Sequence, residues 1–370
     1  MPSNRRFGAL ALVCCIWLGA CDLGDDEEEN KRADDRARSA CSRPAPEAPA
    51  VTLRYRVESA PTTPGSFEET KSALCARLDK LRLPAVQVRQ AGPELVIRAP
   101  RRLGEDVELA TMPGELRFYD WEPNAVGRRA VDVPFAGPTA LFQAVQRASR
   151  MSPRAESTDA RPGPSDASSP AEADRLNDSS GPRYYLFGAD RRLIAGPATN
   201  QGTLAGARGG KAPGSRTLRV PQGITVLQAE RAAGERRGLE RFFVLEDDVE
   251  LSRSGIARPK AGVDRQTREP VVVFDFNEAG RRSFAALTRR VAERGSGAPA
   301  GDPEAAQQRF AITLDTRIVA LATVDSRENP QGLDGRTGAQ IGGFSSPGQA
   351  RRVARLLAAP PLPGTFVRVG

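Results

Sequence analysis

Histidine is absent from the 370-residue sequence. Its absence excludes Ser-His-Asp and Cys-His nucleophiles, His-based proton transfer and His-containing metal sites. The five cysteines include no Cys-x-x-Cys pair, so no zinc site is expected. The sequence also offers no recognisable nucleophile–base pair. We therefore expect no enzyme activity, no catalytic residue, no bound metal and no cofactor.

Apolar residues are sparse, at 39% of the chain against 27% charged residues, which is below the usual apolar share of globular domains. With 30 prolines and 35 glycines, a good part of the chain is expected to be irregular. The net charge of +8 indicates a solvated, Arg-rich surface or, alternatively, a basic patch that faces anionic lipid headgroups. No recognition fold or aromatic-interleaved basic stripe accompanies this charge, so nucleic acid is not an expected partner.

Residues 1–20 are typical of a secretory signal peptide. Arg5 and Arg6 precede an apolar run over residues 9–19, which is shorter than the roughly 20 residues that cross a bilayer. The run ends in Leu-Gly-Ala before Cys21, and this ending resembles the bacterial lipobox, in which the cysteine is lipidated. The alternative is an ordinary signal peptide with a chance cysteine. The lipobox predicts a lipoprotein that Cys21 anchors at the extracytoplasmic face of the cell membrane.

Residues 21–50 predict a disordered tether. An acidic run is followed by a Pro/Ala-rich stretch, and both like charges and prolines extend a chain. Cys41 lies in this tether. It is positioned to form a disulfide with Cys75 in an oxidising compartment, whereas a free buried thiol at Cys75 is the alternative.

Residues 51–150 predict a β-α-β-β-α-β order, the ferredoxin-like arrangement. Residues 51–58 alternate apolar and polar side chains, as a half-buried strand does. Ser66 begins a capping box before a helix in which Leu74 and Leu78 share one face. The remaining elements are expected as strands around residues 86–88, 95–98 and 115–119 and as a helix over residues 103–111. A further amphipathic helix is expected over residues 139–151.

Residues 151–182 are rich in Ser, Pro, Ala and Asp without periodicity, and they predict a disordered insertion. Residues 183–239 are expected to form a small β-rich connecting region. Its glycine-rich loop resembles a phosphate-binding loop around Lys211, but Ala212 stands where Ser or Thr is needed. A flexible loop is the preferred interpretation.

Residues 240–370 again predict β-α-β-β-α-β. Asn277 caps one helix, and Ser346 with Pro347 begins another. A final strand is expected at residues 365–369. Helices on one side of mainly antiparallel sheets make this an α+β protein with two ferredoxin-like subdomains.

Three segments have distinctive sequences: residues 242–252 (FFVLEDDVELS), residues 274–280 (FDFNEAG) and residues 328–344 (ENPQGLDGRTGAQIGGF). They resemble the first extracytoplasmic domain, called P1, of the protein-translocase subunit SecD. The first segment looks like the entry to the head subdomain of that family, the second like its strand-to-helix junction, and the third like its glycine-rich loop. Residues 116–124, 139–151 and 184–187 resemble its actinobacterial branch. The resemblance implies a base subdomain over residues 51–150 and a head subdomain over residues 240–370.

This resemblance implies a role in protein export, with the Sec translocon and unfolded secretory polypeptide as partners. SecD continues into several membrane-spanning helices that carry its proton-driven motor, whereas this sequence stops at Gly370 and begins with a lipidation signal. We therefore expect passive holding of a translocating polypeptide. The family-motif loop is the expected contact, through the residues Asp334, Gly335, Arg336, Gly342, Gly343 and Phe344.

Two clusters have competing interpretations. The carboxylates Glu246, Asp247, Asp248 and Glu250 form either a divalent-cation site or an exposed turn, and the turn is preferred because no oxygen-ligand loop pattern surrounds them. Seven arginines on the outer faces of two predicted helices form either a solvated face or a patch for anionic headgroups or an acidic partner; they are Arg281, Arg282, Arg289, Arg290, Arg351, Arg352 and Arg355.

A second function of a different class also fits the sequence. A diverged envelope or solute-binding lipoprotein that retains only this fold would bind a small ligand saturably and would not associate with a translocon.

Overall fold

The computed structural model describes residues 50–59, 67–83, 86–124, 134–151, 181–204, 207, 210, 212–229, 240–297, 305–344, 346–360, 362 and 364–369. The predicted signal peptide, the predicted lipidation site Cys21, the predicted tether with Cys41, Lys211 and nearly all of the predicted disordered insertion lie outside these residues.

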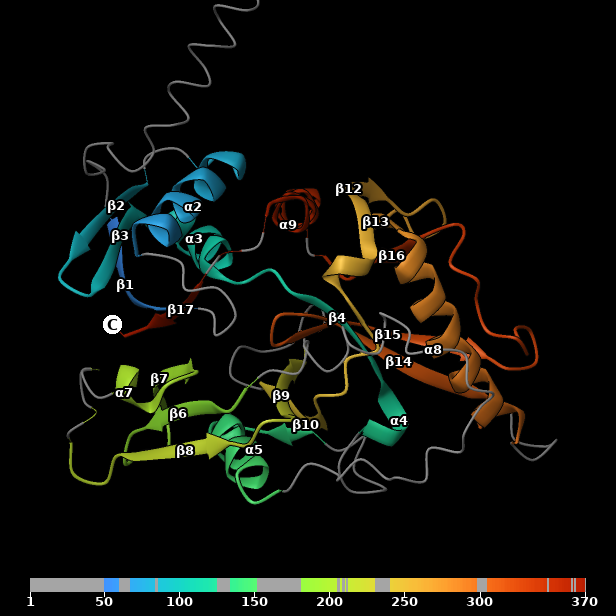
Figure 1. Ribbon diagram of the computed structural model, residues 1–370, viewed down its shortest axis with the longest axis horizontal. Helices are drawn as coiled ribbons and strands as arrows, with labels where there is room; N and C mark the ends of the chain where they lie inside the picture. The colour runs from blue at the N-terminus through green and yellow to red at the C-terminus, as the bar shows by residue number, and fades with distance from the viewer. Residues whose placement is uncertain are drawn as a thin grey trace, which may run out of the picture.

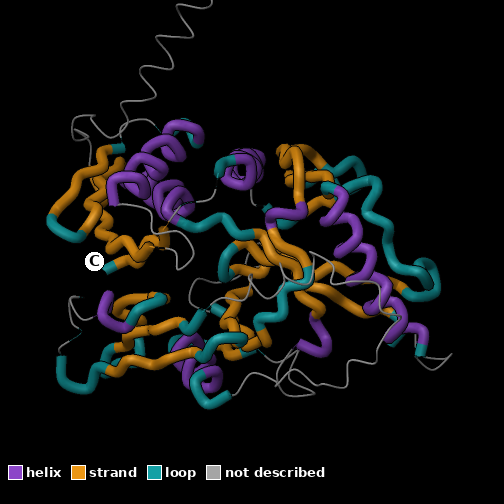
Figure 2. Tube along the Cα trace, viewed as in Figure 1, coloured by secondary structure: helices purple, strands orange, loops and turns teal. Residues whose placement is uncertain are grey.

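The described chain forms four β-sheets and a small number of helices, which confirms the α+β class (Figures 1 and 2). The first sheet has the order β17-β1-β3-β2, and the second has the order β11-β4-β14-β15-β9-β10-β5. The third is β12-β13-β16 and the fourth is β7-β6-β8.

The strands are β1 (Ala50–Ser59), β2 (Gln87–Ala91), β3 (Glu94–Pro100), β4 (Leu116–Asp120), β5 (Phe135–Ala136), β6 (Arg183–Phe187), β7 (Leu193–Ala198), β8 (Arg216–Val220), β9 (Ile224–Ala229), β10 (Arg241–Glu246), β11 (Leu251–Ser252), β12 (Ile256–Val263), β13 (Pro270–Phe276), β14 (Gln307–Leu314), β15 (Arg317–Asp325), β16 (Ala339–Ile341) and β17 (Gly364–Arg368). The helices are α2 (Phe67–Lys80), η2 (Arg101–Leu103), α3 (Gly104–Thr111), α4 (Trp121–Asn124), α5 (Ala140–Ala148), α7 (Gln201–Leu204), η3 (Arg253–Gly255), α8 (Glu278–Ser296) and α9 (Pro347–Ala358).

The first sheet with α2 and α3 has the ferredoxin-like strand order, with the first and third strands in the centre. Its core forms because the inward positions of the strands alternate and because Leu74 and Leu78 lie one turn apart on α2. These leucines are fully buried together with Leu95 and Ile97 of β3 and Val107 of α3.

The fourth strand of this sheet is β17, not the strand expected at residues 115–119. Tyr55 pairs with Arg368 in an antiparallel register, and Figure 1 shows β17 beside β1. The strand expected at residues 115–119 does exist as β4, but it pairs with β14 and β11 of the second sheet. Residues 112–363 are therefore inserted between α3 and the last strand of one ferredoxin-like unit.

The C-terminal third also distributes its strands differently from the expectation. The predicted β-α-β-β-α-β run corresponds to β13, α8, β14, β15, α9 and β17. However, β13 lies in the third sheet, β14 and β15 lie in the second, and β17 lies in the first. Helices α8 and α9 share one apolar core with strands of the second and third sheets, which contains Phe118, Phe274, Phe284 and Leu357.

The predicted starts of both C-terminal helices are confirmed. The side chain of Asn277 accepts a hydrogen bond from the Gly280 N–H at 2.8 Å. The Ser346 hydroxyl accepts one from the Gln349 N–H at 3.2 Å, with Pro347 in the first helical turn. Each cap satisfies one of the backbone donors that a helix start leaves without an intrahelical partner.

The fourth sheet contacts the first through polar side chains of β1. The Glu58 carboxylate is buried and accepts hydrogen bonds from the Thr199 N–H and hydroxyl, both at 2.6 Å, and from the Asn200 N–H at 3.1 Å. The Arg56 guanidinium donates to the Thr203 carbonyl at 2.7 Å. These bonds hold the sheet containing β6 beneath β1 and β17 (Figure 1).

Two arginines, the buried Arg77 and the half-buried Arg253, hold the connections between the first and second sheets. Arg77 of α2 donates to the carbonyls of Ala110 at 3.4 Å, Pro113 at 3.2 Å and Pro360 at 2.8 Å, and it also bonds the Met112 carbonyl. Burial, followed by the nearby Arg253, lowers the pKa of Arg77 to about 10, so it stays charged at neutral pH. The chain leaving α3 and the chain approaching β17 are thus fixed to one guanidinium.

Arg253 also holds this junction. Its guanidinium donates to the Gly114 carbonyl at 3.1 Å and to the Leu357 carbonyl at 2.8 Å near the C-terminus of α9. A cation at this position also interacts favourably with the helix dipole. These contacts place the segment after α3 at the edge of the cavity described below.

Candidate functional site

The family-motif loop expected as a contact surface packs along α8. The Thr288 hydroxyl accepts a hydrogen bond from the Leu333 N–H at 2.9 Å. A Cβ on Gly332 would lie 2.5 Å from the Arg289 nitrogen, and a Cβ on Gly338 would lie 2.3 Å from the Phe274 carbonyl oxygen. Both glycines have positive φ, at 74° each. The loop therefore needs glycine there for backbone geometry and close approach.

The polar residues at the tip of this loop are exposed. The Asp334 carboxylate accepts from the Arg336 N–H at 2.9 Å and forms an ion pair with the Arg336 Nε at 3.3 Å. The side chains are 64% and 83% exposed. Gly335 lies beneath them with φ of 67°, and a Cβ there would lie 3.0 Å from the Phe284 ring. Asp334 and Arg336 are thus accessible to a partner.

The end of the loop turns inward instead. Phe344 is 6% exposed and belongs to the core that α8 and α9 share. Gly343 has φ of 85°, whereas a Cβ on Gly342 would meet only the Val271 side chain, at 3.9 Å. Of the predicted contact residues, Phe344 is therefore a core residue.

The acidic cluster near residue 246 is partly buried, so its interpretation as an exposed turn is wrong for two of its members. Asp247 and Glu250 are 5% and 8% exposed. Asp247 accepts from the Tyr119 hydroxyl at 2.8 Å and pairs with Arg117 at 3.4 Å, and Glu250 pairs with Arg290 at 2.5 Å. Within the described residues, no group of three or more potential ligands could hold a metal ion. Charge pairing explains why these carboxylates can be buried.

The arginines on the two outer helix faces divide into paired and exposed members. Arg282 pairs with Glu278 at 2.6 Å, and Arg352 pairs with Asp106 at 2.5 Å. Arg290 is paired as described above. The basic surface available to a lipid or an acidic partner is therefore smaller than the sequence pattern predicts.

A cavity of about 310 Å³ lies where the first, second and fourth sheets meet. Its walls come from β1 and β17, from β4, from β6 to β9, and from the segment after α3. The turn between β14 and β15 closes one side. The Asp315 carboxylate in this turn accepts hydrogen bonds from the N–H groups of Gly114 and Glu115, both at 2.9 Å. The cavity thus unites segments that lie more than 200 residues apart.

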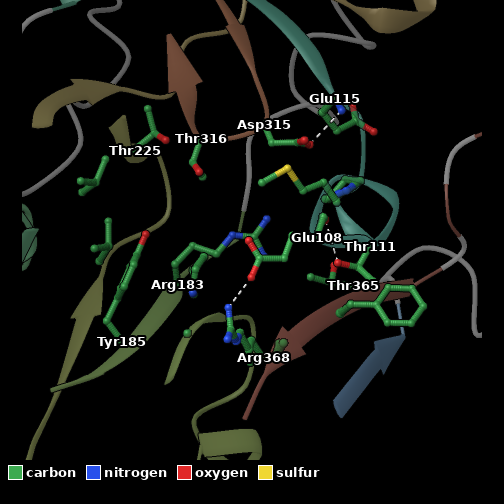
Figure 3. Close-up of a pocket in the computed structure, with 18 of the residues that line it drawn as sticks. Glu108, Thr111, Glu115, Arg183, Tyr185, Thr225, Asp315, Thr316, Thr365 and Arg368 are labelled. Carbon is green, nitrogen blue, oxygen red and sulfur yellow. Dashed lines mark hydrogen bonds and ion pairs between the residues drawn. The ribbon is translucent and has the colours of Figure 1, made fainter. Parts of the chain in front are cut away.

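Charged groups from opposite walls face this cavity (Figure 3). Asp315 and Glu115 lie together on one side, whereas Arg183 and Tyr185 come from β6. Arg117 is paired with Asp247, and Arg368 forms an ion pair with Glu108. Arg183 has no hydrogen bond or ion pair within the described part of the chain.

A buried oxygen atom of a cavity-lining residue, the Oδ2 of Asp315, also has no hydrogen-bond partner among the described residues. Buried polar atoms in folded proteins are nearly always hydrogen-bonded, so an unmet one calls for an explanation.

Burial dominates the electrostatics of these groups. It raises the pKa of Asp315 to about 6, and the neighbouring Glu115 carboxylate adds to this shift, while the N–H groups of Glu115 and Gly114 oppose it. Burial lowers the pKa of Arg183 and raises that of Tyr185 to about 12. Burial thus acts on the Asp315 carboxyl, the Arg183 guanidinium and the Tyr185 hydroxyl, which share a cavity with partly apolar walls.

The sequence did not reveal this cavity. Its polar residues are isolated in the chain, and none of the predicted contact residues lines it. The signal in the sequence was Arg183 at the start of an apolar strand, because a charged residue there needs a partner or a polar environment.

Cys75 is disulfide-bonded, so the alternative of a free thiol is wrong. The other four cysteines lie outside the described residues. No helix within the described residues combines the length and apolar character needed to cross a membrane.

Comparison with known proteins supports the relation to SecD in the C-terminal region. Residues 227–364 match the family model described as SecDF, P1 head subdomain. No curated protein matches the chain.

Two solved structures are similar to the chain. One is described as the crystal structure of SecDF in Super-membrane-facing form, with 16% identity and a TM-score of 0.38; the match covers 93% of this chain and 34% of that one. The other is described as the structure of a membrane component SecDF that enhances protein export, with 14% identity and a TM-score of 0.37, over 86% of this chain and 98% of that one. The chain therefore spans about a third of the length of the first. Identities and TM-scores this low do not establish a common overall arrangement.

Proposed function

We propose that this chain is a lipid-anchored, extracytoplasmic accessory of protein export that holds translocating polypeptide, without catalysing a reaction and without using a proton gradient. The observation that carries the proposal is the match of residues 227–364 to the SecDF P1 head subdomain. The expected partners are the Sec translocon and unfolded secretory chains.

The disulfide at Cys75 supports a location outside the cytoplasm, because disulfides persist mainly in oxidising compartments. We propose Cys41 as its partner, since Cys14 and Cys15 lie in the predicted signal peptide and Cys21 is the proposed lipidation site. Peptide mapping without reductant should recover a Cys41–Cys75 crosslink. A free Cys41 in the mature protein would contradict this pairing.

The lipid anchor is tested at Cys21. The wild-type chain should incorporate labelled palmitate and stay with membranes washed in carbonate, whereas Cys21→Ser should lose both properties. Arg5→Gln, which leaves the lipobox unchanged, is the control. Retention of Cys21→Ser in washed membranes would refute anchoring by this cysteine.

Two exposed surfaces are candidates for contact with an extended polypeptide. Strand β2 lies at the end of the first sheet, has an uninterrupted register with β3, and exposes Arg89. An open, regular edge of this kind can accept an additional strand. The edge strand β12 is less suitable, because it contains a register shift between Ala257 and Lys260 as well as Pro259. The exposed tip of the family-motif loop, at Arg336, is the second candidate.

The decisive experiment is site-specific photocrosslinking in cells. A photoreactive residue at position 89 or 336 should crosslink to secretory precursors during export. The matched control is position 260 on β12, which is also exposed. Equal crosslinking at all three positions, or crosslinking only to abundant folded proteins, would refute the proposal.

The cavity favours the second candidate function, that of a solute-binding lipoprotein, because it is a concave site with polar groups on opposite walls. The crosslinking experiment separates the two functions, because a solute-binding lipoprotein would give no crosslink to precursors.

A further inference from the structure

Among the described residues, the charged side chains of the cavity that lack an ion pair have opposite signs. Arg117 and Arg368 are neutralised by Asp247 and Glu108 respectively. What remains is the Arg183 guanidinium on one wall and the Asp315 and Glu115 carboxylates on another (Figure 3).

This distribution argues against a simple ion as the ligand. An inorganic anion attracted to Arg183 would be repelled by the two carboxylates, and a metal cation would be repelled by the guanidinium. A dipolar ligand satisfies both walls at once. The guanidinium fork matches a carboxylate, and an ammonium group can donate to the Oδ2 of Asp315, which has no hydrogen-bond partner among the described residues.

The apolar walls and the size of the cavity narrow the ligand further. Val220, Ile224, Val226 and Phe366 line it, and they offer an environment for an aliphatic side chain. A volume of about 310 Å³ is at the lower end for ligand pockets, which are roughly 300–1,000 Å³. A ligand of one or two amino-acid residues fits this size, whereas a long peptide does not.

We infer that the cavity binds a small aliphatic zwitterion, a free amino acid or a dipeptide, with its carboxylate on Arg183 and its ammonium group on Asp315 and Glu115. This inference does not depend on the polypeptide-holding proposal, since neither Arg89 nor Arg336 lines the cavity.

The test is calorimetric titration of the full-length chain with leucine and with alanyl-leucine, each compared with its N-acetylated and C-amidated forms. At least one unmodified probe should bind saturably in a one-to-one ratio. Either modification should weaken binding about 10- to 100-fold, as expected for loss of one hydrogen bond to a charged group.

Two variants assign the two ends of the ligand. Arg183→Gln should weaken binding of the unmodified probe, and the C-amidated form should then bind this variant as tightly as the unmodified probe does. Asp315→Asn keeps an acceptor for the N–H groups of Gly114 and Glu115. In this variant the difference in affinity between the unmodified and the N-acetylated probe should become smaller. Arg219→Gln is the matched control, because Arg219 is exposed on β8 of the same sheet and does not line the cavity.

Each remaining outcome overturns the inference. No saturable binding of any unmodified probe at millimolar concentration would do so. Equal binding of modified and unmodified probes, or unchanged binding in Arg183→Gln with a wild-type circular dichroism spectrum and melting temperature, would do so as well. Precursor crosslinking at positions 89 and 336 would be unaffected by these results, so the two proposals can fail separately.

Discussion

The family-motif loop and the cavity differ in how their residues come together. The loop is one continuous segment, residues 328–344, whose glycines follow a recognisable pattern and whose backbone lies on α8. The cavity is built from single residues of three sheets and has no sequence motif. The contrast shows that a motif marks where the backbone is constrained, whereas a binding site can arise wherever charged side chains from distant strands meet.

The largest expected effect is on the loop backbone. Gly338→Ala should destabilise the protein by about 3–5 kcal/mol, because it combines an unfavourable positive φ with a Cβ 2.3 Å from the Phe274 carbonyl oxygen. Chemical denaturation measures the change. Gly342→Ala in the same loop is the control and should change stability by less than about 0.5 kcal/mol, since its Cβ meets only Val271 at 3.9 Å. Similar losses in both variants would show that the loop has no special backbone requirement at residue 338.

The next largest effect concerns the edge of the cavity. Arg77→Met should cost about 2–3 kcal/mol, because it removes the donor of the buried Ala110 carbonyl and of the partly buried bonds to the Met112, Pro113 and Pro360 carbonyls. Lys80→Met is the control on the same helix, since the Lys80 Nζ bonds the Ala358 carbonyl at an exposed position. Equal unfolding free energies for the two variants would mean that Arg77 does not hold this junction.

A smaller effect should appear in the pH dependence of stability. The pKa of Asp315 is raised to about 6 from 3.8, so the folded protein holds a proton that the unfolded chain releases between these values. The free energy of unfolding should therefore fall as the pH rises from about 4 to 6, by about 1–3 kcal/mol for this group. Asp315→Asn should remove this fall.

Asp264 is a control for that measurement, because its effect on stability changes with pH in the opposite direction. Hydrogen bonds from the Thr267 N–H, the Gln340 side chain and the Gln266 N–H lower its pKa to about 2. Its contribution to the free energy of unfolding is present above pH 4 and is lost as the pH falls toward 2. A wild-type fall between pH 4 and 6 that persists in Asp315→Asn would assign it to another group.

The smallest effect on stability should come from the exposed tip of the loop. Arg336→Ala breaks an ion pair whose partners are both largely exposed, so the unfolding free energy should change by less than about 0.5 kcal/mol. If the tip contacts polypeptide, the yield of precursor crosslinks at a neighbouring loop position should nevertheless fall. Arg268→Ala, another exposed arginine outside the loop, is the control. A large loss of stability in Arg336→Ala would make the tip a structural element.

Local elements of the fold could be predicted because short-range forces determine them. The caps at Asn277 and Ser346 and the apolar face of α2 follow from hydrogen-bonding groups and side-chain spacing within a few residues. The pairing of strands could not be predicted in the same way. Strands β4 and β17 have similar β-forming patterns, and only long-range packing selects β17 as the neighbour of β1.

The candidate sites show the same difference between local and long-range determinants. The glycine pattern of the family-motif loop was visible in the sequence, but the burial of Phe344 and the exposure of Arg336 were not. The burial of Asp247 was missed because its partners, Tyr119 and Arg117, are about 130 residues away in the chain.

By itself, the sequence determined the absence of histidine chemistry, the α+β class, the resemblance to SecD and the positions of most helices and strands. The tertiary structure alone decided which strands share a sheet, which carboxylates are buried, and that Arg183 faces Asp315 and Glu115 across a cavity. The physical reason is that backbone propensity and capping act over a few residues, whereas burial and charge pairing depend on neighbours that only folding brings together.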